Sequence, residues 1–192
     1  MITVVDYKAG NTFSVIQAFE RLGKKVVLTA DPDLIYQSQH VIFPGVGSAK
    51  SAMDNINERE LKTCLQELKQ PFLGVCLGMQ MLLNFSEEGS TEMLSIVPER
   101  IDKFKEAPKI PHMGWNSVYD LKGPLFKDIS SESDFYFVHS YRLGPSKFSI
   151  ANCSYGEEFS AAVNYKNYFG VQFHPEKSSE NGNQILKNFL AL

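Results

Sequence analysis

The sequence predicts a three-layer α/β fold with a central, mostly parallel sheet to which antiparallel strands are added. In the first half of the chain, short runs rich in valine and isoleucine alternate with helical segments. This pattern is typical of parallel strands joined by right-handed crossovers. After residue 85, strand-like runs follow one another closely, which favours hairpins. With no linker or repeat, residues 1–192 are expected to form a single domain.

The elements of the first half follow from the spacing of apolar residues. Phe13–Leu22 has the spacing of an amphipathic helix and is closed by Gly23. Ser51–Leu68 is expected to be helical in two pieces, and apolar residues at helical spacing predict another helix over Leu77–Phe85. The strands expected here are Ile2–Asp6, Lys25–Thr29, His40–Phe43 and Phe72–Val75.

The second half is expected to begin with a polar loop, Ser86–Ser90, and to close with a helix, Asn181–Leu190. Ile185, Leu186 and Phe189 would pack that helix against the sheet. The strands expected between the two are Ile96–Phe104, Trp115–Asp120, Asp134–His139, Phe148–Tyr155, Glu158–Tyr165 and Tyr168–Phe173.

Composition excludes several classes of function. The formal net charge of −3 provides no basic patch for nucleic acid and no polybasic membrane tail. No apolar run approaches membrane-spanning length, and Met1–Asp6 is too short for a signal peptide. The three cysteines are an odd number without metal or disulfide spacing, so a cytoplasmic location is expected.

One cysteine stands in a pattern that indicates catalysis. Cys76 follows the short apolar run that ends at Val75, and it has Gly74 and Gly78 two residues to either side. A strand, a sharp glycine-flanked turn and a helix form the nucleophile elbow, here with cysteine instead of serine. The N–H of Leu77 would then donate to an oxyanion formed at Cys76. The alternative is a buried structural cysteine, the usual fate of a free cysteine.

Partners for Cys76 are expected at the carboxyl ends of neighbouring strands, where ligands bind in open α/β sheets. Pro44–Gly47 follows one strand, and its two glycines would let a backbone N–H of this segment face inward as a second oxyanion donor. Another strand ends in His174-Pro175-Glu176, where Glu176 would reach back and fix the tautomer of His174. Each of these segments could by itself be an ordinary turn.

The remaining histidines and the only tryptophan admit structural interpretations. His139 ends a strand and either lines the same cleft or is a hydrogen-bonded residue at the edge of the sheet. His40 is expected to be structural, and Trp115 is either a packing anchor or part of an interface. The spacing of the histidines and cysteines suggests no metal site and no cofactor.

The elbow and the downstream His-Pro-Glu resemble the class I (triad) glutamine amidotransferases, which have a flavodoxin-like three-layer fold. The match runs essentially from end to end. Further segments are similar to one subfamily, the glutaminase subunits of imidazole glycerol phosphate synthase. These segments are Asp6–Asn11, Pro44–Gly47, Pro111–Asn116, Phe137–Tyr141 and Gly170–Ser178.

The resemblance implies that the chain hydrolyses L-glutamine to glutamate and ammonia through a γ-glutamyl thioester. Cys76 would be the nucleophile, His174 the group that moves protons, and Glu176 the group that orients His174. The family's further roles fall on two sets of residues. Leu77 and Val46 or Gly47 would form the oxyanion hole, and the amino-acid end of the substrate would be held by Gln80, Ser140 and Tyr141.

The resemblance also implies a partner. Asn11, Trp115 and Lys177 fall in segments that face a cyclase subunit in the subfamily. This cyclase is a (β/α)8 barrel, bound as a heterodimer, in which ammonia gives imidazole glycerol phosphate and an aminoimidazole carboxamide ribotide in histidine biosynthesis. Two alternatives stay open: a glutaminase that feeds another synthase, such as a sugar-modifying one, and a catalytically dead interaction subunit.

The chain departs from the subfamily pattern at three positions where glycine is usual, namely Lys8, Ser95 and Glu99. None of the three belongs to the expected triad. Lys8 is near the expected partner surface, so the coupling to a partner is where a difference would arise.

Overall fold

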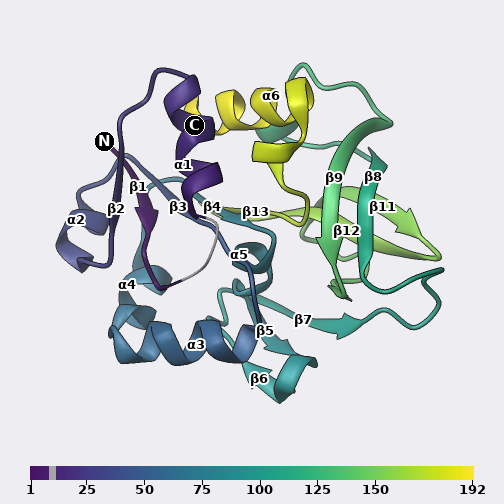
Figure 1. Cartoon of the computed structure of the whole chain (residues 1–192), viewed down its shortest axis with the longest axis horizontal. Coiled ribbons are helices and arrows are strands. Elements are labelled where there is room, and N and C mark those ends of the chain that lie inside the picture. Colours follow the sequence, from purple (N-terminus) through teal and green to yellow (C-terminus); the bar gives the residue numbers. More distant parts are fainter. Residues whose placement is uncertain (9–11) are drawn as a thin grey trace.

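The structure is a computed structural model that describes residues 1–8 and 12–192. Its main sheet has nine strands (Figure 1). Their order is β2 (Val26–Thr29), β1 (Ile2–Val5), β3 (His40–Phe43), β4 (Phe72–Val75), β13 (Tyr168–Val171), β12 (Glu157–Tyr165), β11 (Ser149–Tyr155), β8 (His112–Tyr119) and β9 (Ser133–His139). The first five strands in this order, from β2 to β13, pair with one another in parallel. The pairs from β13 onward to β9 are antiparallel, which confirms the predicted mixed sheet.

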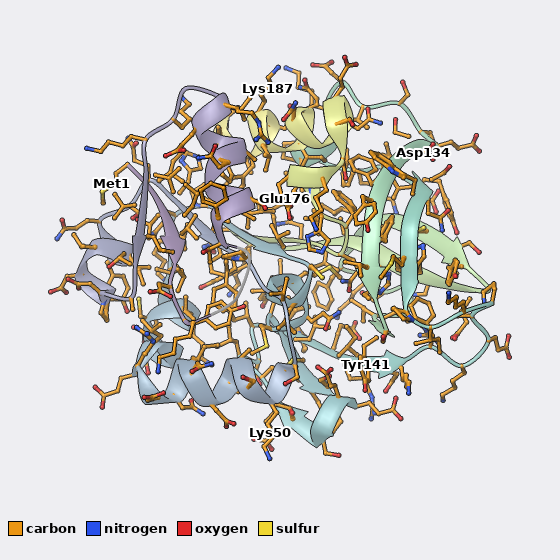
Figure 2. All side chains as sticks on the ribbon, viewed as in Figure 1. Met1, Lys50, Asp134, Tyr141, Glu176 and Lys187 are labelled. Atoms are coloured by element: carbon orange, nitrogen blue, oxygen red, sulfur yellow. The ribbon has the colours of Figure 1, made fainter. Side chains whose placement is uncertain are left out.

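Successive side chains along the parallel strands point to opposite faces of the sheet, which creates two hydrophobic cores, one on each face. In β1, Val4 packs into one core and Val5 into the other. Helices α1 (Thr12–Arg21) and α6 (Ser179–Leu190) cover the first face. The other is covered by α2 (Pro32–Tyr36), α3 (Ala49–Glu58) and α4 (Leu61–Glu67). Side chains fill both interlayer spaces, as expected for three layers (Figure 2).

The second face also carries a small four-stranded sheet. Its strand order is β10 (Tyr141–Arg142), β7 (Val97–Lys103), β5 (Leu83–Ser86) and β6 (Thr91–Glu92). Single helical turns complete the chain: α5 (Leu77–Gln80), η1 (Glu88–Ser90), η2 (Pro124–Phe126) and η3 (Pro175–Lys177).

The predicted helix over Leu77–Phe85 is wrong. Helix α5 ends at Gln80, and Leu83–Ser86 is strand β5 of the small sheet. The run from Met79 to Leu83 is almost wholly buried, so its apolar residues fit a core helix and a core strand equally well. The sequence also failed to indicate α2, which Asp31 caps by accepting the N–H of Asp33.

Two of the three positions where the subfamily has glycine adopt a left-handed backbone, which explains that preference. Lys8 has φ 62° and Ser95 has φ 55°. A residue with a Cβ is less stable in this conformation than glycine by about 1 kcal/mol.

Within the described ranges, no helix is both long and apolar enough to cross a membrane.

One glycine of the elbow fits only because it has no side chain. A Cβ built on Gly78 lies 1.8 Å from the carbonyl oxygen of Phe43, at the end of the neighbouring strand β3. Backbone atoms of two central elements cannot both move aside, so this contact fixes how closely the elbow approaches β3.

Gly78→Ala should therefore lower the free energy of unfolding by about 3 kcal/mol or more, measured by urea denaturation. Gly144→Ala is the matched control, because the nearest atom to a Cβ there is the flexible end of Arg142 at 3.2 Å. The control should change stability by less than about 0.5 kcal/mol. Equal stability of the two variants would contradict the packing argument.

Candidate active site

The candidate site lies at the carboxyl ends of three neighbouring parallel strands. Strand β3 leads into Pro44–Gly47, β4 into Cys76, and β13 into His174. Phe43 pairs with Gly74, and Val75 pairs with Val171, so the three strands end almost level. The prediction that these segments meet at one edge of the sheet is confirmed.

Cys76 occupies a strained turn. Its backbone has φ 53° and ψ −110°, a conformation that L-residues rarely adopt, and its N–H donates to Val171 at 2.8 Å. The next helix is only one turn long, so it provides no macrodipole of the size that a long helix would have. What remains is the N–H of Leu77, which donates none of the backbone hydrogen bonds found among the described residues.

The imidazole of His174 is held by the carboxylate of Glu176. Nδ1 of His174 lies 2.8 Å from Oε1 of Glu176, and both side chains are almost fully buried. Burial disfavours the charged imidazole, but the interactions with nearby Cys76 and with Glu176 outweigh it and raise the pKa of His174 to about 10. Nε2 is buried without a hydrogen-bond partner in the described residues. It is thus free to exchange a proton with the thiol.

The antiparallel half of the sheet curls back over this edge. The N–H of His174 donates to Tyr136 of β9 at 2.8 Å, and Ser178 Oγ accepts the N–H of Tyr136 at 3.0 Å. The thiol of Cys76 donates to the carbonyl of Val138 at 3.7 Å. Strand β9, the far edge in the strand order, therefore forms one wall of the site.

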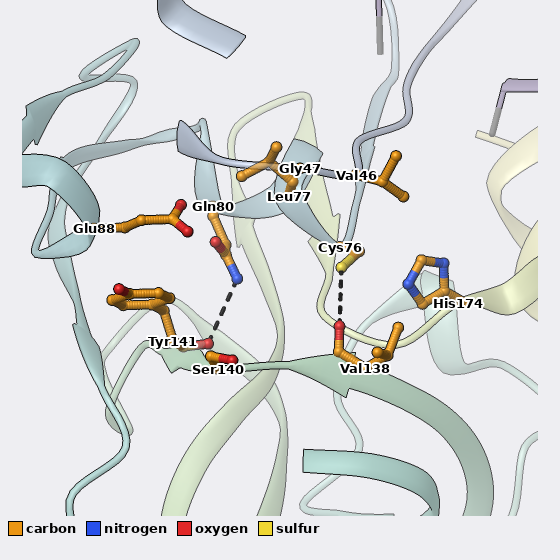
Figure 3. A pocket seen from close by; sticks show the side chains of 10 residues that line it. All are labelled: Val46, Gly47, Cys76, Leu77, Gln80, Glu88, Val138, Ser140, Tyr141 and His174. Carbon is orange, nitrogen blue, oxygen red and sulfur yellow. Dashed lines mark hydrogen bonds between the residues drawn. The ribbon is translucent and has the colours of Figure 1, made fainter. Parts of the chain in front are cut away.

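These elements enclose a pocket of about 270 Å³, a volume suited to a small metabolite. In Figure 3 the ring of His174 lies beside the sulfur of Cys76 at one end, and Glu88 and Tyr141 lie at the other. The pocket brings together every residue expected to bind substrate or form an oxyanion hole: Val46, Gly47, Leu77, Gln80, Ser140 and Tyr141.

Glu88 and Val138 also line the pocket, and sequence reasoning missed them. Glu88 stands in what the sequence indicates as an exposed loop, but its Oε2 accepts the N–H of Ala49 at 2.7 Å, which ties the loop to α3. The backbone carbonyl of Val138 accepts from the thiol of Cys76, a contact that any residue could make, so no sequence signal pointed to this position.

A buried amide connects the two ends of the pocket. Gln172 Nε2 donates to the sulfur of Cys76 at 3.6 Å, and its Oε1 accepts from Gln80 Nε2 at 3.0 Å. Gln80 also donates to the carbonyl of Tyr141 at 3.5 Å. The nucleophile and the far wall of the pocket thus belong to one hydrogen-bonded network.

Two of the residues expected at a partner interface lie around one tyrosine outside the pocket. Trp115, 53% exposed, meets the ring of Tyr136 edge-on at 6.2 Å. Lys177 directly follows Glu176, and its Nζ lies 5.7 Å from the centre of the same ring. Asn11 lies outside the described residues.

Cys64, Cys153, His112 and His139 are buried, whereas His40 is half-buried at the start of β3. Burial raises the pKa of the Cys64 thiol and raises that of Cys153 to about 12. His139 does not join Cys76 and His174, because its nitrogens contact His112 and the Tyr141 carbonyl. Across the ranges 1–8 and 12–192, no three side chains of the types that hold metal ions gather into a site.

Comparisons with known proteins give a consistent result. The family profile "Glutamine amidotransferase class-I" matches residues 3–192. The chain is 44% identical over 194 residues to "Imidazole glycerol phosphate synthase subunit HisH" of Bacteroides fragilis, covering 100% of this chain and 99% of the relative. It is 45% identical over 191 residues to the protein of the same name in Haemophilus influenzae, covering 98% and 96%.

Solved structures resemble the fold at lower sequence identity. A crystal structure described as a glutamine amidotransferase superposes with a TM-score of 0.77 at 14% identity, covering 100% of this chain and 98% of the other. A chain in the structure of PurLQS from Thermotoga maritima gives 0.71 at 16% identity, covering 99% and 97%. At these identities the likeness concerns the fold alone, and it agrees with the three-layer architecture.

Proposed function

Because this chain belongs to the class-I glutamine amidotransferases, and among them to the HisH subunits of imidazole glycerol phosphate synthase, we propose that it hydrolyses L-glutamine through Cys76, His174 and Glu176. One observation carries the assignment of these residues. The thiol sits on a strained elbow beside the unpartnered Nε2 of His174, whose other nitrogen is fixed by Glu176. This is the arrangement of a nucleophile, a proton carrier and an orienting carboxylate.

In the first half of the reaction, the ion pair of thiolate and imidazolium attacks the side-chain amide of glutamine. The raised pKa of His174 favours the imidazolium at neutral pH, and its positive charge stabilises negative charge on the attacking sulfur. The sulfur forms a bond to the amide carbon, and the π electrons of the carbonyl move to its oxygen. The N–H of Leu77, with one from Val46 or Gly47, would stabilise this oxyanion. Nε2–H of His174 then protonates the nitrogen, which leaves as ammonia and leaves a γ-glutamyl thioester.

In the second half, water replaces ammonia in the same geometry. Nε2 of His174 takes a proton from the water, whose oxygen attacks the thioester carbon. The C–S bond then breaks, which restores the thiolate and the imidazolium and releases the product, whose new γ-carboxyl group gives its proton to solvent to become glutamate. Glu176 stabilises the imidazolium in both halves through its bond to Nδ1.

The other end of the pocket suits the amino-acid end of glutamine. Backbone N–H groups at Ser140 and Tyr141 would bind the α-carboxylate, and the carboxylate of Glu88 would bind the α-ammonium. Among the described residues that line the pocket, Glu88 is the one with an acidic side chain, so it would balance the charge of an ammonium group. Gln80 lies between these groups and holds the wall through Tyr141.

The ammonia is expected to pass to a cyclase subunit in histidine biosynthesis. The names of the relatives describe a subunit of imidazole glycerol phosphate synthase, which supports this assignment over a sugar-modifying synthase. We propose a heterodimer with a HisF-like (β/α)8 barrel, and a partner surface that includes Asn11, Trp115 and Lys177. We also propose that residues 1–192 act as one domain in the cytoplasm, where free thiols such as Cys64 and Cys153 stay reduced.

A glutamine-like electrophile should label Cys76 selectively. Diazo-oxo-norleucine carries the amino-acid end that the pocket fits and reacts with a thiolate, whereas the pKa values of Cys64 and Cys153 are raised by burial. Peptide mapping after reaction at neutral pH should place the adduct on Cys76, and excess glutamine should slow it. A main adduct on Cys64 or Cys153 would refute the assignment, and no adduct would favour a catalytically dead subunit.

A further inference from the structure

Two buried histidines have no part in the reaction described above. His112 begins β8 and His139 ends β9, and the two residues are paired across these strands. Nδ1 of His112 lies 3.0 Å from Nε2 of His139, and the two residues are only 2% and 5% exposed. Neither histidine lines the pocket, but His139 directly precedes Ser140 and Tyr141, which do.

Their hydrogen bonds allow only one arrangement of protons. A carbonyl only accepts, so Nδ1 of His139, 2.8 Å from the oxygen of Tyr141, carries a proton. Burial lowers the pKa of His139 to about 3 and that of His112 to about 4, so both rings are neutral at pH 7. Nε2 of His139 therefore accepts, and Nδ1 of His112 donates to it.

The series of hydrogen bonds begins at Asn116, before His112. With Nδ1 protonated, Nε2 of His112 is an acceptor, and the amide nitrogen of Asn116 lies 3.4 Å from it. The same amide donates to the carbonyl of Ser154 at 2.9 Å. The hydrogen bonds thus run in one direction, from Asn116 through His112 and His139 to the carbonyl of Tyr141.

Aromatic side chains hold both rings in place. His112 stacks on Tyr155 with ring centroids 4.0 Å apart and on Phe137 at 5.0 Å. His139 contacts Phe159 at 5.0 Å and Phe104 at 5.2 Å. Rings packed in this way cannot rotate freely, so the direction and length of the bond to Tyr141 are fixed.

The carbonyl of Tyr141 joins this series of hydrogen bonds to the hydrogen-bonded network that includes Cys76. Gln80 Nε2 approaches it from the pocket side, as Figure 3 shows, and Gln80 is linked through Gln172 to the sulfur of Cys76. The bond from His139 to a carbonyl two residues later closes a turn over Ser140. That turn presents the backbone assigned above to the α-carboxylate of glutamine.

We propose that His139, supported by His112, is a positioning residue that fixes the Ser140–Tyr141 turn for binding the amino-acid end of glutamine. The inference rests on the proposed function, because it assigns a role within the same pocket. Neither histidine touches the reacting atoms. Their effect is therefore expected on substrate affinity more than on the chemical step.

Two replacements of His139 separate positioning from simple packing. The side-chain nitrogen of asparagine sits near the place of Nδ1, so His139→Asn keeps a donor for Tyr141, whereas His139→Leu fills the space without one. His139→Leu should raise the KM for glutamine about tenfold with a smaller effect on kcat, and His139→Asn should stay within about threefold of the unaltered protein. If packing alone matters, the order is reversed, because leucine suits an apolar core better than asparagine.

The rate at which Cys76 is labelled distinguishes a positioning role of His139 from a purely structural role. Iodoacetamide reports the thiol alone, whereas diazo-oxo-norleucine also needs the amino-acid end of the pocket. His139→Leu should slow labelling by diazo-oxo-norleucine about tenfold and leave labelling by iodoacetamide unchanged. If both rates fall together, or if KM is unchanged, the proposal is overturned. If the unaltered protein is not labelled by diazo-oxo-norleucine, the proposed function itself fails.

Two further variants guard against misfolding. His112→Phe keeps the ring stack but removes the donor to His139, and it should raise KM by a smaller factor than His139→Leu. His40→Asn is the control, since His40 lies at the start of β3 and packs against Phe189, far from the pocket. It should leave KM unchanged, and thermal melting of all variants checks that they fold.

Discussion

Replacing His174 with alanine should reduce glutamine hydrolysis by about 10³-fold to 10⁴-fold. The imidazole stabilises the thiolate before attack, protonates the departing nitrogen and then activates water. In the alanine variant, each of these steps lacks its proton carrier. Its Nε2 has no other partner in the described residues, and its pKa is raised to about 10 by contacts with Cys76 and Glu176 despite burial. Ammonia release measured at saturating glutamine tests this expectation.

Glu176→Gln is the matched, milder change. The amide keeps the size of the carboxylate but removes its charge and can present an N–H to Nδ1, which disfavours the required tautomer. A loss of at least about tenfold in kcat is expected, with an unaltered melting profile. If Glu176→Gln behaves as the unaltered protein does, a different group orients His174 and the triad assignment is wrong.

Adding the cyclase with its nucleotide ligand should raise the glutaminase rate at least about a hundredfold. Among the described residues, those that line the pocket form no second site where ammonia could be used, and free ammonia would be protonated and lost. Lys177 directly follows Glu176, so a partner bound at this surface is one residue away from the triad. One oxyanion donor gained at Val46 or Gly47 is worth about 3 kcal/mol, which corresponds to the expected stimulation.

Steady-state ammonia release with and without the liganded cyclase measures this coupling. Lys177→Ala or Trp115→Ala should reduce the stimulation, because both side chains pack on Tyr136 at the exposed side of β9. Neither variant should alter labelling of Cys76, since neither residue lines the pocket. Equal rates with and without the cyclase would refute partner control and favour a different ammonia acceptor.

The parts that the sequence predicted are those that depend on local chemistry. The elbow at Cys76 needs glycine at fixed offsets, and the imidazole of His174 is fixed by a carboxylate only two residues away. The parallel order of the first strands follows from their alternation with helices. All of these signals lie within a short window of the chain.

The parts that the sequence missed depend on long-range packing. Leu83–Ser86 is a strand because β7 is available to pair with it, and nothing in its own residues specifies that partner. Glu88 reaches the pocket only because α3 holds its carboxylate through Ala49. Strand β9 returns to the site because the antiparallel half of the sheet curls, a property of the whole sheet.

The position of β13 in the main sheet affects when during synthesis and folding the active site can form. This strand is late in the chain, yet it pairs between β4 and β12 in the middle of the main sheet. Its contact with β4 joins segments nearly 100 residues apart, as the bond between Gln172 and Cys76 also does, with a separation of 96. Contacts of such high sequence separation form slowly during folding, because a long loop must close first. A chain growing on the ribosome carries its nucleophile long before its proton carrier, so glutamine hydrolysis through this triad begins only after synthesis has passed His174.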